Sequence, residues 1–494
     1  MTSVAPSDPK ATRGTPWVVW ALVAAVFRIA AAALVPVLPE EAYHWCYARH
    51  LSTGYYDHPP MIAWMIAMGR WLFGDTALGI RFVPVLGSLA TSIALGSLSS
   101  RLHGNDAARW TVLLLAVQPA TFVGSAFGFP DAPLLLFWSL SMLFVIHALQ
   151  SRRAAWWPAA GAAWGAALLS KYTAFFFAGS LLLYLAVSPR DRGWLRTPWP
   201  YVAVVVGLLV FSPVLHWNAT HDWASFRFQS VHRFERMESP SPAGAGVFLA
   251  AQWGAILPLT LPLAVAAAGA ALRRRTPGDL LLLCLSLPML FFFLLVGAAR
   301  ATHVFWPLPA YLSLVVLMGE AAARGSGRIP RLFRAGRGWI LGASAVAILA
   351  VTVHVVHPFP RIPTLRGVYD WDVIAERVRG LRADLPAESF VLGVGKRYLC
   401  AAQLAFYLDA PEEVQAKNLL GEEGLQFAYW TRLERLRNRD AVVVVDGGWS
   451  PQAETLLRKR FHTVERTGEW TVFSRAGPRR EQYLFFVARG YSPP

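Results

Sequence analysis

The sequence predicts a polytopic α-helical membrane protein that ends in a small α/β domain. Of its 494 residues, 55% are hydrophobic and only 15% are charged, whereas soluble domains carry about 25% charged residues. Apolar runs close to the ~20 residues that cross a bilayer recur along residues 1–357. Residues 358–494 instead alternate helical and strand-like patterns, which favours a separate α/β domain.

The apolar runs predict eleven transmembrane helices. They lie near residues 16–38, 78–99, 109–127, 133–150, 155–169, 172–187, 199–217, 246–271, 279–298, 303–320 and 339–357. The two runs that flank Lys171 are short, which suggests a broken helix opening on a cavity. Residues 60–73 (PMIAWMIAMGRWLF) are apolar but too short to span, and suit a helix in the membrane interface. The first run is too long for a signal peptide and lacks a small-residue cleavage site, so we interpret it as a retained span.

Basic residues predict the orientation, because they gather in every second gap between the runs and such gaps face the cytoplasm. They are Lys10 and Arg13, Arg101 and Arg109, Arg152 and Arg153, Arg190, Arg192 and Arg196, Arg273 to Arg275, and those from Arg324 to Arg337. The amino terminus, which carries the first of these clusters, is therefore expected in the cytoplasm, and an odd number of spans places the chain after about residue 358 outside. The first outer loop (39–77) and residues 358–494 fall on the periplasmic side of a bacterial inner membrane. The net charge of +16 comes largely from these anchors, and no soluble basic stripe with interleaved aromatics predicts nucleic-acid binding.

The tail contains two helical patterns, DVIAERVRGLRADL and PQAETLLRKRF, around a strand-like AVVVVDGG. No Gly-rich nucleotide fingerprint follows that strand, so we interpret it as structural. Cys46, Cys284 and Cys400 have no disulfide or metal spacing and are expected as free thiols, although Cys46 and Cys400 share the side where a disulfide could form. No cofactor is predicted. A requirement for a divalent metal is left open, although nothing in the sequence indicates one.

Five segments on the predicted outer face carry ionisable groups. They contribute Glu40, Glu41, His44, Arg49, Asp57 and His58; Asp131; Lys171; His216, Asn218, His221, Asp222 and Arg227; and Arg300 and His303. Such groups are costly at membrane depth and mark function. A carboxylate can act as general base on a hydroxyl, Lys and Arg can neutralise a leaving phosphate, and aromatic rings stack on sugars. The set predicts glycosyl transfer from a lipid-phosphate sugar.

The run EEAYHWCYARHLSTGYYDHPPMIAW resembles the first outer loop of bacterial family-39-like membrane glycosyltransferases, relatives of protein O-mannosyltransferases and lipid A aminoarabinose transferases. The stretches PDAPLLLFW, LLSKYTAFFF, SPVLHWNATHDWASFRFQ, HVFWPLPAYL and AAQLAFYL are similar to further family blocks, so the resemblance covers nearly the whole chain. It implies the glycosyltransferase C fold, a polyprenyl-phosphate-linked sugar donor, and an inverting single displacement. The hexosyl or pentosyl group would pass to a lipid, glycan or protein of the cell envelope.

The resemblance also implies roles for individual residues. The family's leading acid is Asp, thought to be the base, and here Glu40 occupies that position; its extra methylene leaves Glu41 as the alternative, and we prefer Glu40. The residues expected to bind substrate are Tyr55, Tyr56, Asp57, His58, Asp131, Lys171, Tyr172, His216, Asn218, Arg300 and His303. Among them, Tyr55 and Tyr56 would flank the donor, and Lys171 would bind its phosphate. Asp57 and His58 would orient the loop.

Plainer explanations remain open at this stage. Glu40 and Glu41 could be solvated loop acids, Asp57 and His58 turn formers, Asp131 a helix-dipole acid, Lys171 a snorkelling lysine, Arg300 an anchor and His303 a core histidine. For the whole chain, the alternatives are a lipid or sugar transporter or flippase, and an inactive binding relative. A transporter would favour repeated halves, and the sequence shows none.

Overall fold

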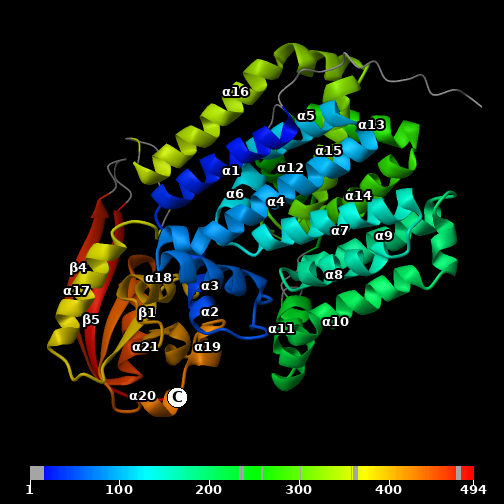
Figure 1. The fold of residues 1–494 in the computed structure, drawn as a ribbon. Helices are drawn as coiled ribbons and strands as arrows, with labels where there is room; N and C mark the ends of the chain where they lie inside the picture. The colour runs from blue at the N-terminus through cyan, green and yellow to red at the C-terminus, as the bar shows by residue number, and fades with distance from the viewer. Residues whose placement is uncertain are drawn as a thin grey trace, which may run out of the picture.

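A computed structural model describes the chain apart from residues 1–15, 233–234, 236–238, 257–259, 301, 358, 360–364, 366, 474–479 and 494. Lys10 and Arg13, which entered the orientation argument, therefore lie outside the described residues. Figure 1 shows a bundle of helices that run in roughly one direction, with a β-sheet domain at one end. The predicted fold class, a polytopic helical protein with a small sheet domain near its carboxyl end, is confirmed.

The first half of the bundle begins with α1 and ends with α10. Its helices are α1 Trp17–Leu34, α2 Pro39–Arg49, α3 Met61–Phe73, α4 Ala77–His103, α5 Asn105–Val117, α6 Pro119–Ala126, α7 Asp131–Ser151, α8 Trp156–Leu168, α9 Phe175–Val187 and α10 Trp199–Thr220, with 3-10 turns η1 Tyr172–Ala174 and η2 Arg192–Arg196. The predicted interfacial helix is α3, which starts just after Pro60 and exposes Trp71 by 85%. The break predicted at Lys171 is present, because that residue is extended between α8 and η1.

The second half of the bundle begins after α10. It consists of α11 Ala224–Arg227, the π-turn η3 Phe228–His232, α12 Pro242–Ile256, α13 Leu261–Arg274, α14 Pro277–Ala299, α15 Leu308–Arg324 and α16 Arg328–Val356. The run predicted as one span at 246–271 therefore falls on two helices, α12 and α13. In Figure 1, α16 lies beside α1 along one flank of the bundle.

Fewer described helices meet the length and hydropathy expected of a membrane span than the eleven spans predicted. Six described helices are long and apolar enough to cross a membrane, or seven if the bent pair α5 and α6 counts as one. That pair replaces the single span expected at 109–127 and bends by 73°. The physical reason is Pro119, which opens α6 and holds Gln118 in an extended conformation, so the helix cannot continue through it.

The carboxyl-terminal domain is a mixed sheet covered by helices. Its elements are α17 Trp371–Ala383, β1 Phe390–Val394, α18 Leu399–Leu408, β2 Val414–Ala416, η4 Lys417–Leu420, α19 Phe427–Trp430, α20 Leu433–Leu436, β3 Ala441–Asp446, η5 Gly447–Trp449, α21 Ser450–Arg458, β4 Phe461–Phe473 and β5 Arg480–Tyr491. The strand order is β2-β1-β3-β5-β4, with β1 parallel to β2 and β3, and β5 antiparallel to β3 and β4. The strand predicted from AVVVVDGG is β3, buried along most of its length as a central strand should be.

The sheet domain and the first outer loop share one hydrophobic core. Tyr43 and Tyr47 of α2 and Ile62 of α3 belong to the same buried cluster as Trp371 and Phe427 of the tail. Helix α18 packs directly on α2. Because packed interiors do not deform continuously, this core holds the domain at a defined position over the end of the bundle.

Candidate active site

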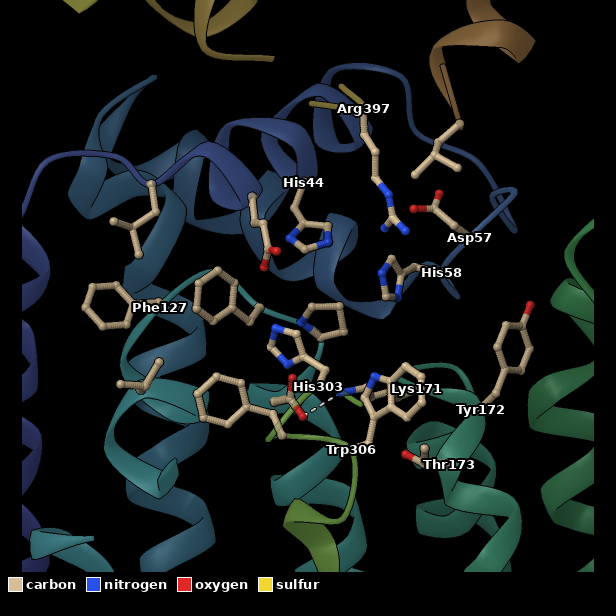
Figure 2. Close-up of a pocket in the computed structure, with 18 of the residues that line it drawn as sticks. His44, Asp57, His58, Phe127, Lys171, Tyr172, Thr173, His303, Trp306 and Arg397 are labelled. Atoms are coloured by element: carbon tan, nitrogen blue, oxygen red, sulfur yellow. Dashed lines mark hydrogen bonds and ion pairs between the residues drawn. The ribbon is translucent and has the colours of Figure 1, made fainter. Parts of the chain in front are cut away.

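A cavity of about 1260 Å³ lies between the bundle and the sheet domain. Its polar walls come from α2, the loop before α3, the start of α7, the α8–η1 break, the end of α14 and the β1–α18 turn. Figure 2 shows His44, His58, Lys171, His303 and Arg397 facing this common space. The cavity continues into an apolar arm lined by α6, α14 and α16.

The two adjacent acids of α2 have opposite environments. Glu41 is fully buried and forms a paired contact with Arg81, at 2.7 Å from Nε to Oε1 and 2.5 Å from Nη2 to Oε2. Its carboxylate also accepts the backbone N–H groups of Leu38 and Gly128. Glu40 is exposed and lines the cavity, and within the described part of the chain it has no ion pair or hydrogen bond for its carboxylate.

The Glu41–Arg81 pair fixes the amino-terminal end of α2 against α1 and α4. Arg81, inside α4, also donates to the carbonyls of Ala32, Val35 and Pro36 at the end of α1. Gly128 has no room for a side chain in this packing, because an added Cβ would lie 2.7 Å from the Ile80 side chain. An arginine within an apolar run was the available signal for this pair, and the sequence analysis did not use it.

The GYYDHPPM loop alternates between packing and cavity residues. Tyr55 is buried and donates to the carbonyls of Tyr47 and His50, so it faces away from the cavity. Asp57 lines the cavity wall, and its carboxylate accepts the hydroxyl groups of Tyr43 and Tyr47. Tyr56 and His58 line the cavity. The loop is therefore both a braced turn and part of the wall.

The helix break brings a buried ion pair into the cavity. Lys171 Nζ lies 2.8 Å from Asp131 Oδ1, and both residues line the cavity. Asp131 is the first residue of α7, where its charge also favours the helix dipole. Tyr172 lines the cavity, and its hydroxyl lies 2.7 Å from Ser225 Oγ.

The remaining predicted residues divide between the cavity and the scaffold. Arg300 and His303 line the cavity next to the end of α14. His216 is exposed on α10 and lies outside the described lining. Asn218 is buried and structural, since its amide donates to the Val214 carbonyl and accepts the Phe226 N–H.

His44 is a cavity residue that the sequence analysis counted without assigning it a role. Its Nδ1 lies 2.9 Å from the Gly128 carbonyl, so Nδ1 carries the proton and Nε2 carries a lone pair. Nε2 is buried and has no hydrogen-bond partner among the described residues. The helix α2 lies outside the membrane-spanning segments, and burial lowers the pKa of His44 to about 4. The imidazole is therefore neutral at pH 7 and offers an acceptor at the cavity wall.

The described residues contain no cluster of three or more His, Cys, Asp or Glu side chains that could hold a metal ion. Cys46, Cys284 and Cys400 are buried free thiols. The cavity lining includes carboxylate, imidazole, ammonium and guanidinium groups, together with hydroxyl and amide groups.

Comparisons with known proteins find transferases among the proteins to which this chain is similar. A family model described as dolichyl-phosphate-mannose-protein mannosyltransferase matches residues 57–217. The lipid A galacturonosyltransferase RgtD of Rhizobium johnstonii is 28% identical over 281 residues, covering 56% of this chain and 59% of that protein. An undecaprenyl phosphate-alpha-4-amino-4-deoxy-L-arabinose arabinosyl transferase of Pseudomonas fluorescens is 29% identical over 295 residues, covering 57% of this chain and 52% of that protein. The chain thus spans little more than half the length of these curated relatives.

The crystal structure of ArnT from Cupriavidus metallidurans bound to undecaprenyl phosphate superposes over 95% of this chain and 97% of that one, with a TM-score of 0.66 and 19% identity. The chain has the glycosyltransferase C fold. The resemblance read from the sequence is confirmed, and with it the multi-pass membrane character of the protein.

Within this glycosyltransferase C fold, Arg397 is a cavity residue that sequence reasoning did not predict. It lies in the turn between β1 and α18, more than 300 positions along the chain from α2. The similarity of AAQLAFYL to a family block was a signal that this part of the tail matters, but it does not include Arg397 and gave no direction for its side chain.

Proposed function

We propose that this protein is an inverting glycosyltransferase that moves a sugar from a polyprenyl-phosphate donor to an acceptor hydroxyl at the outer face of the inner membrane. The observation that carries the proposal is the carboxylate of Glu40, which has no ion pair or hydrogen bond among the described residues and shares one cavity with Lys171 and with an apolar arm. A base, a cation for phosphate and a place for a lipid chain are the three parts that such a transfer needs.

Glu40 is the proposed base. Its carboxylate accepts the proton of the acceptor hydroxyl while that oxygen attacks the anomeric carbon, and the bond from this carbon to the phosphate oxygen breaks. The products are an inverted glycoside and polyprenyl phosphate, and Glu40 then releases its proton to water. Glu41 is a poor candidate because both of its oxygens already accept hydrogen bonds from Arg81 and from backbone N–H groups.

Lys171 is proposed to bind the donor phosphate. An ammonium group has three N–H donors, and the ion pair with Asp131 uses one of them. Arg300, His58 and His303 line the same cavity and are proposed to contact the phosphate or the sugar. A charged leaving group is stabilised by donors that are already in place before the reaction.

The apolar arm is proposed to hold the polyprenyl chain. Phe122 of α6, Phe293 of α14 and Val351 of α16 line it. Helix α16 is largely exposed along its apolar length, as expected for a helix that faces lipid. The relative from Cupriavidus metallidurans was crystallised with undecaprenyl phosphate, which supports a lipid of this class.

The proposed orientation places the amino terminus in the cytoplasm and residues 358–494 in the periplasm, because the basic clusters fall in alternate gaps. A periplasm-specific reporter fused after residue 494 should be active. If only a cytoplasm-specific reporter were active, the orientation would be the reverse of the one proposed. The cavity would then face the cytoplasm and could not take a periplasmic acceptor.

Turnover by the purified protein tests the proposed function. With a polyprenyl-phosphate sugar and an envelope extract as acceptor, the protein should release polyprenyl phosphate and form an inverted glycoside, detected by mass spectrometry and NMR. Binding of the donor lipid without release, in the presence of acceptor, would instead support an inactive binding relative. Movement of the intact donor across a vesicle membrane would support a flippase.

A further inference from the structure

The sheet domain contributes a cationic side chain to the membrane cavity. Arg397 lies in the β1–α18 turn, at the carboxyl end of a strand that is parallel to both of its neighbours. Ligand sites in sheets with parallel strands typically form at that end. Figure 2 shows the Arg397 guanidinium directed into the cavity toward Asp57 and His58.

The turn that carries Arg397 is fixed against α2. The neighbouring Tyr398 ring stacks on Tyr43 with ring centroids 3.5 Å apart and an interplanar angle of 10°. Gln403 of α18 donates to the Val37 carbonyl at 3.0 Å. The position of Arg397 is therefore tied to the helix that carries Glu40.

The backbone at Arg397 has φ +53°, in the left-handed region that few non-glycine residues adopt. Such conformations are costly for a non-glycine residue and concentrate at ligand-binding sites. The conformation here turns the Arg397 side chain toward the cavity.

The guanidinium has no hydrogen bond or ion pair within the described part of the chain, although it is exposed to the cavity. Two other cations near this wall have carboxylate partners: Arg81 pairs with Glu41, and Lys171 pairs with Asp131. Because the Asp131 carboxylate offsets the charge of Lys171, this ion pair alone is a weak site for an anion. Arg397 adds a positive charge with up to five N–H donors, and none of them is used in a hydrogen bond or ion pair among the described residues.

We propose that Arg397 binds an anionic group of the substrate, so that the sheet domain completes the membrane site. This inference rests on the proposed function and specifies its binding chemistry. A planar guanidinium pairs in a bidentate manner with phosphate or carboxylate. The group is either the phosphate of the polyprenyl donor or an anionic group beside the acceptor hydroxyl, and the two sources differ in which substrate loses affinity when Arg397 is replaced.

The test uses the full chain in lipid nanodiscs and compares R397Q and R397K with the matched control K396Q. Lys396 is the adjacent exposed residue and lies outside the described cavity lining. Undecaprenyl phosphate alone is the probe for donor binding, and turnover at saturating donor gives KM for the acceptor and kcat. Thermal unfolding checks that each variant is folded.

We expect R397Q to weaken one of the two substrates by about 10- to 100-fold, the usual loss for a hydrogen bond to a charged group. R397K should recover part of that loss, and K396Q should match the parent. Weaker binding of undecaprenyl phosphate assigns the contact to the donor. Unchanged donor binding with a raised acceptor KM assigns it to the acceptor.

Failure of the inference differs from failure of the proposed function. If the parent transfers sugar and folded R397Q keeps both the donor affinity and the acceptor KM, the inference is overturned and the function stands. If the parent binds undecaprenyl phosphate, loses it in R397Q and transfers no sugar, the anion site stands and the proposed function is overturned.

Discussion

Two polar cavities lie at opposite ends of the same helices, and they differ in how their charges are paired. The large cavity contains Asp131 at the start of α7 and Arg300 just after α14. A second cavity of about 370 Å³ contains Gln150 near the end of α7 and Asp279 at the start of α14. Both gather acids and bases from several loops.

In the small cavity each carboxylate has a basic partner. Arg274 lies 3.0 Å from Asp279 and 2.8 Å from Glu320, and Arg152 lies 2.9 Å from Asp191. In the large cavity the carboxylate of Glu40 and the guanidinium of Arg397 have no such partner among the described residues. Paired charges at a helix end need no explanation beyond structure, whereas unpaired ones around a large cavity indicate a ligand that supplies the missing contacts.

The largest expected effect is on turnover in E40Q. The substitution keeps the shape of the side chain and removes the basic lone pair, and general-base contributions are roughly 10²–10⁴ in rate. Turnover should fall by that factor while undecaprenyl phosphate still binds. E40D keeps a carboxylate that can accept the proton, so it should retain more activity than E40Q. Turnover at the parent rate in E40Q would show that Glu40 is not the general base.

The second largest effect is on the stability of E41Q. Breaking a buried ion pair typically costs 3–5 kcal/mol, because the remaining charge, here on Arg81, stays buried without compensation. Unfolding followed in detergent should show a large loss of stability. The activity per folded E41Q molecule should equal that of the parent. A fully folded E41Q that is catalytically dead would instead make Glu41 part of the chemistry.

A third prediction concerns acid stability through His44. Burial holds the folded-state pKa at about 4, below the unfolded value of about 6.5, so the unfolded chain binds the extra proton first. The His44 contribution is therefore complete above about pH 6.5 and decreases as the pH falls toward about 4, by up to about 3 kcal/mol. The free energy of unfolding should fall more steeply with decreasing pH in the parent than in H44Q. Parallel pH dependences of the two proteins would contradict a buried neutral imidazole.

The smallest effect tests the paired cluster of the small cavity. D279N removes the negative charge that pairs with Arg274. Arg274 is about one-third exposed and keeps its second partner, Glu320, so the loss is partly compensated. Stability should fall by about 1 kcal/mol, with kcat and KM unchanged. A large loss of turnover in folded D279N would show that the small cavity also takes part in function.

The sequence predicted well the features that depend on local pattern. Two prolines and a short apolar run gave α3, and the short runs around Lys171 gave the break. It could not predict which of Glu40 and Glu41 is buried. Neighbouring residues on a helix point about 100° apart, and which carboxylate faces Arg81 depends on how α2 packs on α4. It also treated residues 39–49 as loop and left β4 and β5 unassigned.

Arg397 illustrates why the rest of the site could not be predicted. Its approach to α2 depends on Tyr398 stacking on Tyr43 and on a shared core that joins segments more than 300 residues apart. No local periodicity encodes such a contact. Tyr55, expected to flank the donor, points instead into that core, where its hydroxyl donates to the backbone carbonyls of Tyr47 and His50.

A cryo-EM structure of the full chain with undecaprenyl phosphate compares the two cavities directly. The account predicts the phosphate in the large cavity, within hydrogen-bond reach of Lys171, with the lipid chain along α6, α14 and α16. A phosphate bound in the small cavity against Arg274, with no lipid density in the large one, would contradict it.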